Sequence, residues 1–178
     1  MIQVVEYDPI WPTRFGDLRA EYARSLASAR VPVIAIEHVG STSVPGLAAK
    51  PVIDIDIVVA PDDVAAASRA LIGLGFQPLG EQGIPHRWAF QEPERLARTN
   101  TYVVVDGCLA LRNHLAVREI LRSDHVLRNQ YADVKRRVAA VAHDGDEYVR
   151  GKNDVVQLIL LAAGFTDTER LAIAEQNP

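Results

Sequence analysis

The sequence predicts a mixed α/β fold, in which an α/β core at residues 1–110 is followed by a helical region at 111–178 that packs on it. A β-branched run, Val52–Val59, lies between Pro51 and Pro61 and is typical of a buried strand. Apolar residues at three- and four-residue spacing precede and follow this strand, which favours helices alternating with strands. From about Leu111 onward, helical spacing dominates.

The core is expected to hold two helices and five short strands. The first helix runs from about Pro12 to Ser28, with apolar residues along one face. A β-rich run at 31–39 then stops at Gly40, and Val52–Val59 follows as the second strand. A helix with an acidic first turn is expected at 61–75. The remaining strands are expected at 75–80, 86–90 and 101–106.

The C-terminal region is expected to contain helices separated by a polar break. Apolar residues from Leu127 to Val141 recur at helical spacing. The break, "HDGDEY", covers residues 143–148. A strongly apolar helix at 153–163 follows and ends at Gly164, since glycine is common just after a helix.

Composition restricts the classes of function. The chain has 178 residues, 48% of them hydrophobic, and 19 basic and 23 acidic residues give a net charge of −4. This balance provides no general attraction to nucleic acid or to an anionic membrane, so we expect neither as a partner. A single cysteine, Cys108, excludes an intramolecular disulfide, and the Cys/His spacing of a zinc site is absent. With no apolar run of membrane-spanning length, we expect a cytoplasmic protein.

Asp54 and Asp56 are carboxylates within an otherwise apolar strand. Successive side chains of a strand alternate between faces, so both carboxylates share one face, about 6.6 Å apart along the chain. Two ionised carboxylates at this spacing repel each other, and a hard cation such as Mg²⁺ or Mn²⁺ offsets the repulsion. The alternative is that both lie on a solvated sheet face.

A loop of small residues, "GSTSVPG", precedes this strand by about a dozen residues. Gly40 lets backbone amides turn toward a ligand, while Ser41 and Ser43 offer hydroxyls at an expected helix start, which is a natural phosphate site. The alternative is a plain N-cap and turn. A phosphate loop followed by a pair of metal-binding carboxylates is the arrangement that nucleotidyl transfer requires.

The stretch "IEHVGSTSVPGLAAKPVIDIDIVV" closely resembles the signature of the GrpB family. The resemblance extends to "VVEYDPIWPTRF", "GIPHRWAF", "YADVKRRVA" and "YVRGKNDVV". It implies a polymerase-β-type nucleotidyltransferase core, in which Gly40 and Ser41 are the glycine-serine motif and Asp54 and Asp56 are the catalytic, metal-binding pair. A similar domain is fused to dephospho-CoA kinase in some bacteria, which implies a functional link to coenzyme A biosynthesis.

Basic and aromatic residues are candidates for binding a nucleotide. Lys50 lies just before the aspartate strand and can reach its rim. The resemblance implies that Lys135 and Lys152 hold phosphate, and Tyr148 is a candidate for stacking on a base; the alternatives are surface charges and core packing. His38, directly before the turn, is expected to orient the turn or to hydrogen-bond a ligand; the alternative is a structural hydrogen bond to the backbone.

The sequence departs from the family pattern in two places. One is the third carboxylate that such folds usually carry, and the other is a stretch in the helical region. The matching strand reads "RTNTYVVVD", with Asn100 and Tyr102 at the relevant positions, and Glu92 could serve only if the middle strand were adjacent. A family stretch similar to "FRDYLR" reads "VREILR" here; it keeps Arg118 and Arg122, and Glu119 replaces an aspartate.

These features together predict a protein that binds a nucleoside triphosphate with Mg²⁺ or Mn²⁺ and transfers a nucleotidyl group to an acceptor that the sequence does not identify. The alternative is a non-catalytic module that keeps the fold to bind a nucleotide, a coenzyme or a protein. The absent third carboxylate favours the alternative, and the retained D-x-D pair favours the enzyme.

Overall fold

The computed structural model describes residues 2–176, and the chain divides into two compact units. The sheet unit comprises Pro9–Val39 and Val52–Arg112. The helical unit comprises Met1–Asp8, Gly40–Pro51 and Asn113–Pro178. The segment with the glycine-serine turn therefore belongs to the helical unit, whereas the aspartate strand belongs to the sheet unit. The expected division at residue 110 stays a prediction.

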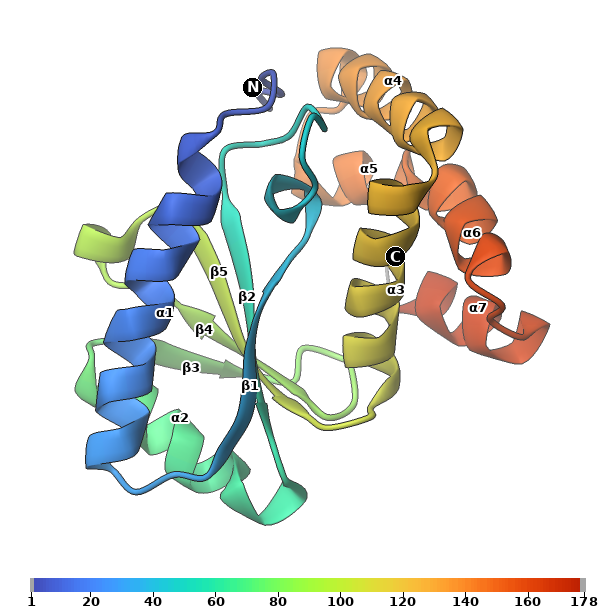
Figure 1. Ribbon diagram of the computed structural model, residues 1–178. Helices are drawn as coiled ribbons and strands as arrows, with labels where there is room; N and C mark the ends of the chain where they lie inside the picture. The colour runs from blue at the N-terminus through green and yellow to red at the C-terminus, as the bar shows by residue number, and fades with distance from the viewer. Residues whose placement is uncertain (1, 177–178) are drawn as a thin grey trace. The chain divides into compact units, whose positions relative to one another are not determined.

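The sheet unit is built from five strands and two long helices (Figure 1). Its helices and strands are α1 (Ile10–Ser28), β1 (Val33–Val39), β2 (Ile53–Val59), α2 (Val64–Gly73), β3 (Gln77–Gly80), β4 (Arg87–Gln91) and β5 (Thr99–Val105). Short 3₁₀ turns at Pro61–Asp63 and Glu94–Leu96 join them. Each expected strand and helix of the core is present, with ends that differ from the expected ones by at most three residues.

The five strands form one mixed sheet in the order β1-β2-β5-β4-β3. Strand β2 pairs antiparallel with β1 and parallel with β5, and the remaining neighbours are antiparallel. The strand expected in the middle of the sequence, β4, is thus separated from β2 by β5. This order decides which side chains can lie beside the two aspartates.

Helices α1 and α2 cover one face of the sheet (Figure 1). Ile53, Ile55 and Ile57 of β2 point to this face and are fully buried. Tyr22 of α1 is buried with them, and its hydroxyl lies 3.0 Å from the Thr101 hydroxyl of β5. Burial of these side chains is the main source of stability in the unit, because each large aliphatic group removed from water contributes about 1.5–3 kcal/mol.

The helical unit contains the remaining helices. They are α4 (His125–Val141), α5 (Gly145–Arg150), α6 (Asn153–Ala162) and α7 (Asp167–Glu175), preceded by the part of α3 (Leu109–Ser123) that follows Arg112. Side-chain caps start several of them: the Asp124 carboxylate accepts from two backbone N–H groups of α4, and Thr166 and Glu169 form a capping box on α7.

A second core lies within the helical unit. Its buried members come from the segment after the glycine-serine turn and from α3, α4 and α6: Val44, Leu47, Leu121, Tyr131, Ala132, Val155 and Ile159. An isolated bridge between Val5 and Ala49 adds two backbone hydrogen bonds of 2.9 Å. The segment 40–51 is therefore part of this core although it has little regular secondary structure.

Two expectations about local structure are wrong. The helix start expected after Gly40 is a single 3₁₀ turn, Ser41–Ser43, because the chain extends again at Val44. The polar break at 143–148 contains the start of helix α5, because the Asp144 side chain accepts a hydrogen bond from the Glu147 N–H and caps it. Among residues 2–176, no helix has the length and apolar character needed to cross a bilayer.

Gly151, at the end of α5, is required by close packing. Its backbone is helical, so alanine would not strain it, but a Cβ atom there would lie 2.6 Å from Val138 Cγ1 of α4. We expect Gly151→Ala to lower the free energy of unfolding by about 1–3 kcal/mol through overpacking. Chemical denaturation of the purified variant measures this.

Gly145→Ala is the matched control, since a Cβ atom at Gly145 would meet nothing within 4 Å. This variant should keep the wild-type stability or gain slightly. Equal stability of the two variants would contradict the packing argument.

Candidate functional site

Strand β2 places Asp54 and Asp56 on the face of the sheet opposite α1 and α2, as the alternation of the strand predicts. Asp54 is half-buried and Asp56 is 0% exposed. The alternative that both lie on a solvated face is therefore wrong for Asp56. A fully buried carboxylate is costly unless polar or cationic groups surround it, so this position is under strong chemical constraint.

Strand β5 supplies the neighbours of the two aspartates. Asn100 lies opposite Asp54 and Tyr102 lies opposite Asp56. The Asn100 side-chain amide donates a hydrogen bond of 2.7 Å to Asp54 Oδ1. Strand β5 carries no carboxylate beside the two aspartates, as the sequence indicated. The adjacency on which a role for Glu92 depended is not met, because β5 separates β4 from β2.

Tyr102 lies between acidic and basic neighbours. The guanidinium carbon of Arg87, on β4, is 4.5 Å from the centre of the Tyr102 ring. The pKa of Tyr102 is raised to about 12, first by burial and then by the charge of Asp54, while the charge of Arg87 opposes the shift. The phenol is therefore a neutral hydrogen-bonding group at physiological pH.

Glu37 is a residue that sequence reasoning missed. It lies opposite Asp56 in the antiparallel pairing of β1 with β2, so its side chain starts from the same face. The alternation of side chains in "IEHV" indicates that Glu37 and Val39 share one face of the strand. Only the register of the two strands shows that Glu37 faces Asp56. Within residues 2–176, no three acidic, histidine or cysteine side chains gather closely enough to hold a metal by themselves.

The glycine-serine turn in the helical unit is compact and internally bonded. Gly40 has φ 67° and ψ −174°, a conformation that favours glycine. The Ser43 hydroxyl is buried and donates a hydrogen bond of 2.6 Å to the Gly40 carbonyl, whereas Ser41 is half-exposed. Ser41 is thus the more accessible of the two predicted phosphate-binding hydroxyls.

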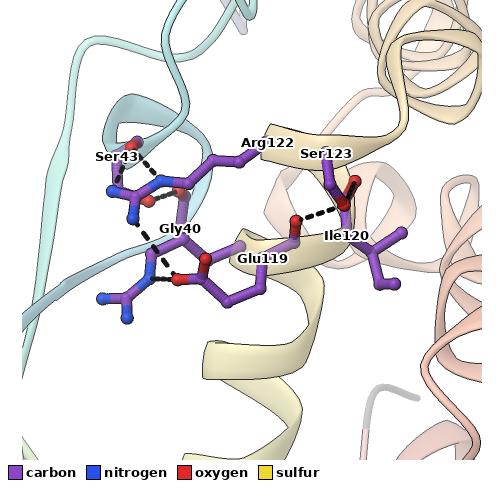
Figure 2. Close-up of polar contacts among 7 residues, drawn as sticks. Gly40, Ser43, Glu119, Ile120, Arg122 and Ser123 are labelled. Atoms are coloured by element: carbon purple, nitrogen blue, oxygen red, sulfur yellow. Dashed lines mark hydrogen bonds and ion pairs between the residues drawn. The ribbon is translucent and has the colours of Figure 1, made fainter.

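Arg122, near the end of α3, holds this turn from outside. Figure 2 shows its guanidinium donating two hydrogen bonds, of 3.2 and 2.8 Å, to the Ser43 carbonyl. The Glu119 carboxylate accepts hydrogen bonds from Arg122 at 3.3 Å and from Arg118 at 2.7 Å. The bond from Arg122 helps to orient the Arg122 guanidinium. A hydrogen bond from a charged donor contributes about 1.5–3 kcal/mol net.

Lys135 lies in the interior of the helical unit. It is 2% exposed, and its ammonium donates a hydrogen bond of 2.7 Å to the Ala48 carbonyl. The ammonium also lies 5.1 Å from the centre of the Tyr131 ring. The structure thus shows Lys135 bound to the backbone of the segment that follows the turn.

Lys50, Lys152 and Tyr148, which were predicted separately, come together in the helical unit. The Lys152 ammonium lies 4.2 Å and the Lys50 ammonium 5.8 Å from the centre of the Tyr148 ring. Tyr148 is 4% exposed, and its hydroxyl is buried without a hydrogen-bond partner among the described residues. Burial, and then the neighbouring Tyr131, raise the pKa of Tyr148, so the phenol stays neutral.

The side chains of His38 and Cys108 are packed within the sheet unit. His38 is buried and stacks on Phe15 of α1, with ring centres 4.7 Å apart. Burial raises the pKa of the Cys108 thiol, whose Sγ lies 3.8 Å from the His86 carbonyl oxygen. A protonated, buried thiol is a poor nucleophile, in agreement with the absence of a predicted role for Cys108.

The surroundings of Tyr102 predict a high-pH titration. A folded-state pKa of about 12, above the ordinary value of 10.0, means that its contribution to stability is complete below pH 10. This contribution is lost as the pH rises from 10 to about 12. We expect the difference in absorbance at 295 nm between wild type and Tyr102→Phe to appear only near pH 12.

Circular dichroism over the same pH range shows whether the protein remains folded during that titration. A difference titration centred near pH 10 in folded protein would contradict the buried, acid-flanked environment of Tyr102.

Known proteins resemble this chain in sequence over most of its length. It is 30% identical over 158 residues to the UPF0157 protein YqkA of Bacillus subtilis, covering 88% of this chain and 45% of that relative. It is 34% identical to the UPF0157 protein BH1888 of Halalkalibacterium halodurans, covering 93% of this chain and 84% of the relative. This chain thus spans less than half the length of one relative and most of the other.

Solved structures resemble it in fold. The crystal structure of conserved protein GrpB from Enterococcus faecalis matches with a TM-score of 0.76 at 26% identity, covering 92% of this chain and all of that one. The structure of the GLD-2/RNP-8 complex matches with a TM-score of 0.55 at 15% identity, covering 86% and 59% of the two chains. The fold is that of the polymerase-β-type nucleotidyltransferases. Residues 1–161 match the family described as GrpB protein, and the chain belongs to the GrpB family.

Proposed function

We propose that this protein binds a nucleoside triphosphate together with Mg²⁺ or Mn²⁺ and transfers the nucleotidyl group to an acceptor. The observation that carries the proposal is the position of Asp54 and Asp56 on one face of β2, in a chain with a nucleotidyltransferase-like fold. A fold alone does not define a reaction, so the proposal depends on these carboxylates.

The donor set of the sheet unit suits one hard divalent cation. Mg²⁺ prefers carboxylate oxygens and is commonly held by one or two carboxylates, with waters and substrate phosphate oxygens completing its shell. Asp54 and Asp56 supply the carboxylates, and the Asn100 amide holds Asp54 Oδ1 in a defined orientation. When bound, the cation would neutralise the charge of the triphosphate.

The chain also offers groups suited to phosphate. Gly40, Ser41 and Ser43 form the turn that would contact phosphate, and the ammonium groups of Lys50 and Lys152 would neutralise it. Both ammonium groups lie near the ring of Tyr148, which is 4% exposed and would therefore position them rather than stack on a base. Support for this part of the proposal comes from the gathering of these three side chains in one unit.

The proposed reaction is a displacement at the α-phosphorus. An acceptor hydroxyl or amine forms a bond to that phosphorus, the bond to the bridging oxygen breaks, and pyrophosphate leaves; the acceptor's proton passes to water. The acceptor is not identified by the proposal. Because the family resemblance implies a link to coenzyme A biosynthesis, CoA and dephospho-CoA are the first compounds to test.

A non-catalytic nucleotide- or coenzyme-binding module is the second candidate. Strand β5 favours it, because Asn100 and Tyr102 occupy the positions beside the aspartates and neither can act as a carboxylate ligand or base. The two candidates differ in one result: the module binds nucleotide but releases no pyrophosphate.

Thermal unfolding with ATP, GTP, CTP, UTP, CoA and dephospho-CoA, each with and without Mg²⁺ or Mn²⁺, tests the binding. A ligand at a hundredfold its dissociation constant stabilises by about 2.7 kcal/mol, which raises Tm by about 5–11 °C for a chain of this size. We expect a metal-dependent shift in wild type that is absent from Asp54→Asn/Asp56→Asn.

Ligand-free Asp54→Asn is the control for folding. Asparagine retains an oxygen that can accept from Asn100, and it removes one of two like charges, so its stability should equal or exceed that of wild type. Marked loss of stability would show that Asp54 is structural. No shift with any nucleotide and metal in wild type would overturn the proposed function.

A further inference from the structure

Three cationic side chains bind consecutive parts of the segment that follows Gly40. Arg122 donates to the Ser43 carbonyl, Arg128 donates to the Pro45 carbonyl at 3.2 Å, and Lys135 donates to the Ala48 carbonyl at 2.7 Å. All six residues belong to the helical unit. The donors follow one another along α3 and α4 in the same order as their acceptors follow one another along the segment.

Such a segment needs external partners for its backbone. Residues 44–51 form no helix or strand apart from the bridge between Val5 and Ala49, and Val44, Leu47 and Ala48 are nevertheless buried. Buried carbonyl groups must accept hydrogen bonds or lose free energy. Charged donors satisfy them strongly and fix the direction of each carbonyl.

Fixing the carbonyls also fixes the amides. A peptide unit is planar and trans, so its C=O and the following N–H point in opposite directions. The amides of Val44 and Ala49 share peptide units with the Ser43 and Ala48 carbonyls, and they donate to the carbonyls of Ser41 and Val5. The Leu47 amide lies one peptide unit beyond the Pro45 carbonyl that Arg128 holds, and it donates to the Val44 carbonyl. One set of bonds thus determines the conformation from the glycine-serine turn to the residue before Lys50.

We propose that Arg122, Arg128 and Lys135 are positioning residues, which hold the backbone of 40–49 in the conformation that binds phosphate. This inference rests on the proposed function. It assigns Lys135 to the backbone of the segment, although the family resemblance implied direct contact with phosphate. The ammonium of Lys135 is buried against Ala48, whereas Lys50 is exposed and Lys152 is half-exposed.

The test compares Arg122→Met, Arg128→Met and Lys135→Met with wild type, all as the full chain. Native-state hydrogen exchange reports the amides of Val44, Leu47 and Ala49 without ligand. Binding of inorganic tripolyphosphate with Mg²⁺, measured by calorimetry, reports the phosphate affinity without a contribution from a base.

We expect the three amides to exchange at least tenfold faster in each variant, while amides of α6 keep their wild-type rates. The affinity for tripolyphosphate should fall at least tenfold in each variant. Arg122→Lys should recover part of both effects, since a lysine at that position can still donate to the Ser43 carbonyl.

Arg137→Met is the matched control, because Arg137 is an exposed cation on the same helix as Arg128 and Lys135. It removes the same charge and should change neither exchange nor affinity beyond twofold. If Lys135→Met does not fold, the variants of Arg122 and Arg128, which lie nearer the surface, decide the result.

Unchanged exchange at the three amides would overturn the inference, even with weaker binding, since the cations would then contact phosphate directly. Faster exchange with wild-type affinity would overturn it as well, because the contacts would be structural only. Absence of binding of tripolyphosphate and of every nucleotide by wild type would overturn the proposed function and the positioning role with it.

Discussion

Strand β2 must bury isoleucines on one face while it keeps two carboxylates on the other, and the sheet unit is arranged around this requirement. Ile53, Ile55 and Ile57 are fully buried against the helix-covered face, so the register of the strand cannot slip by one residue without burying charge there. The same alternation that forms the core therefore fixes Asp54 and Asp56 on one face.

The neighbours of β2 determine what those carboxylates can do. The parallel partner β5 brings an amide and a phenol to them, and the antiparallel partner β1 brings Glu37 opposite Asp56. Strand β5 thus places neutral groups, and no third carboxylate, beside the paired carboxylates of β2. The proposed binding of one cation and the proposed turnover therefore have to be measured separately.

The helical unit buries much of the segment 40–51, which has almost no regular secondary structure. Cationic side chains from α3 and α4 satisfy its carbonyls, and apolar side chains of the same segment join the core around Leu121 and Ile159. Electrostatic and hydrophobic contributions therefore act on the same stretch of backbone. Its conformation depends on residues more than 70 positions away in sequence, as the contact between Arg122 and Ser43 shows.

The sequence alone determined the strand with its two carboxylates, the helices around it and the family, because period-two and helical spacing are local properties of the chain. It also located the missing third carboxylate at Asn100 and Tyr102. It could not show that Asp56 is fully buried, that Glu37 lies opposite it, or that β5 separates Glu92 from the site, since these depend on strand order and register. Likewise, the sequence left Lys135 either as a phosphate ligand or as a surface charge, and only the position of α4 shows its ammonium bound to the Ala48 carbonyl. Only the tertiary structure decided these points, because a hydrogen bond between distant residues leaves no periodic signal in the sequence.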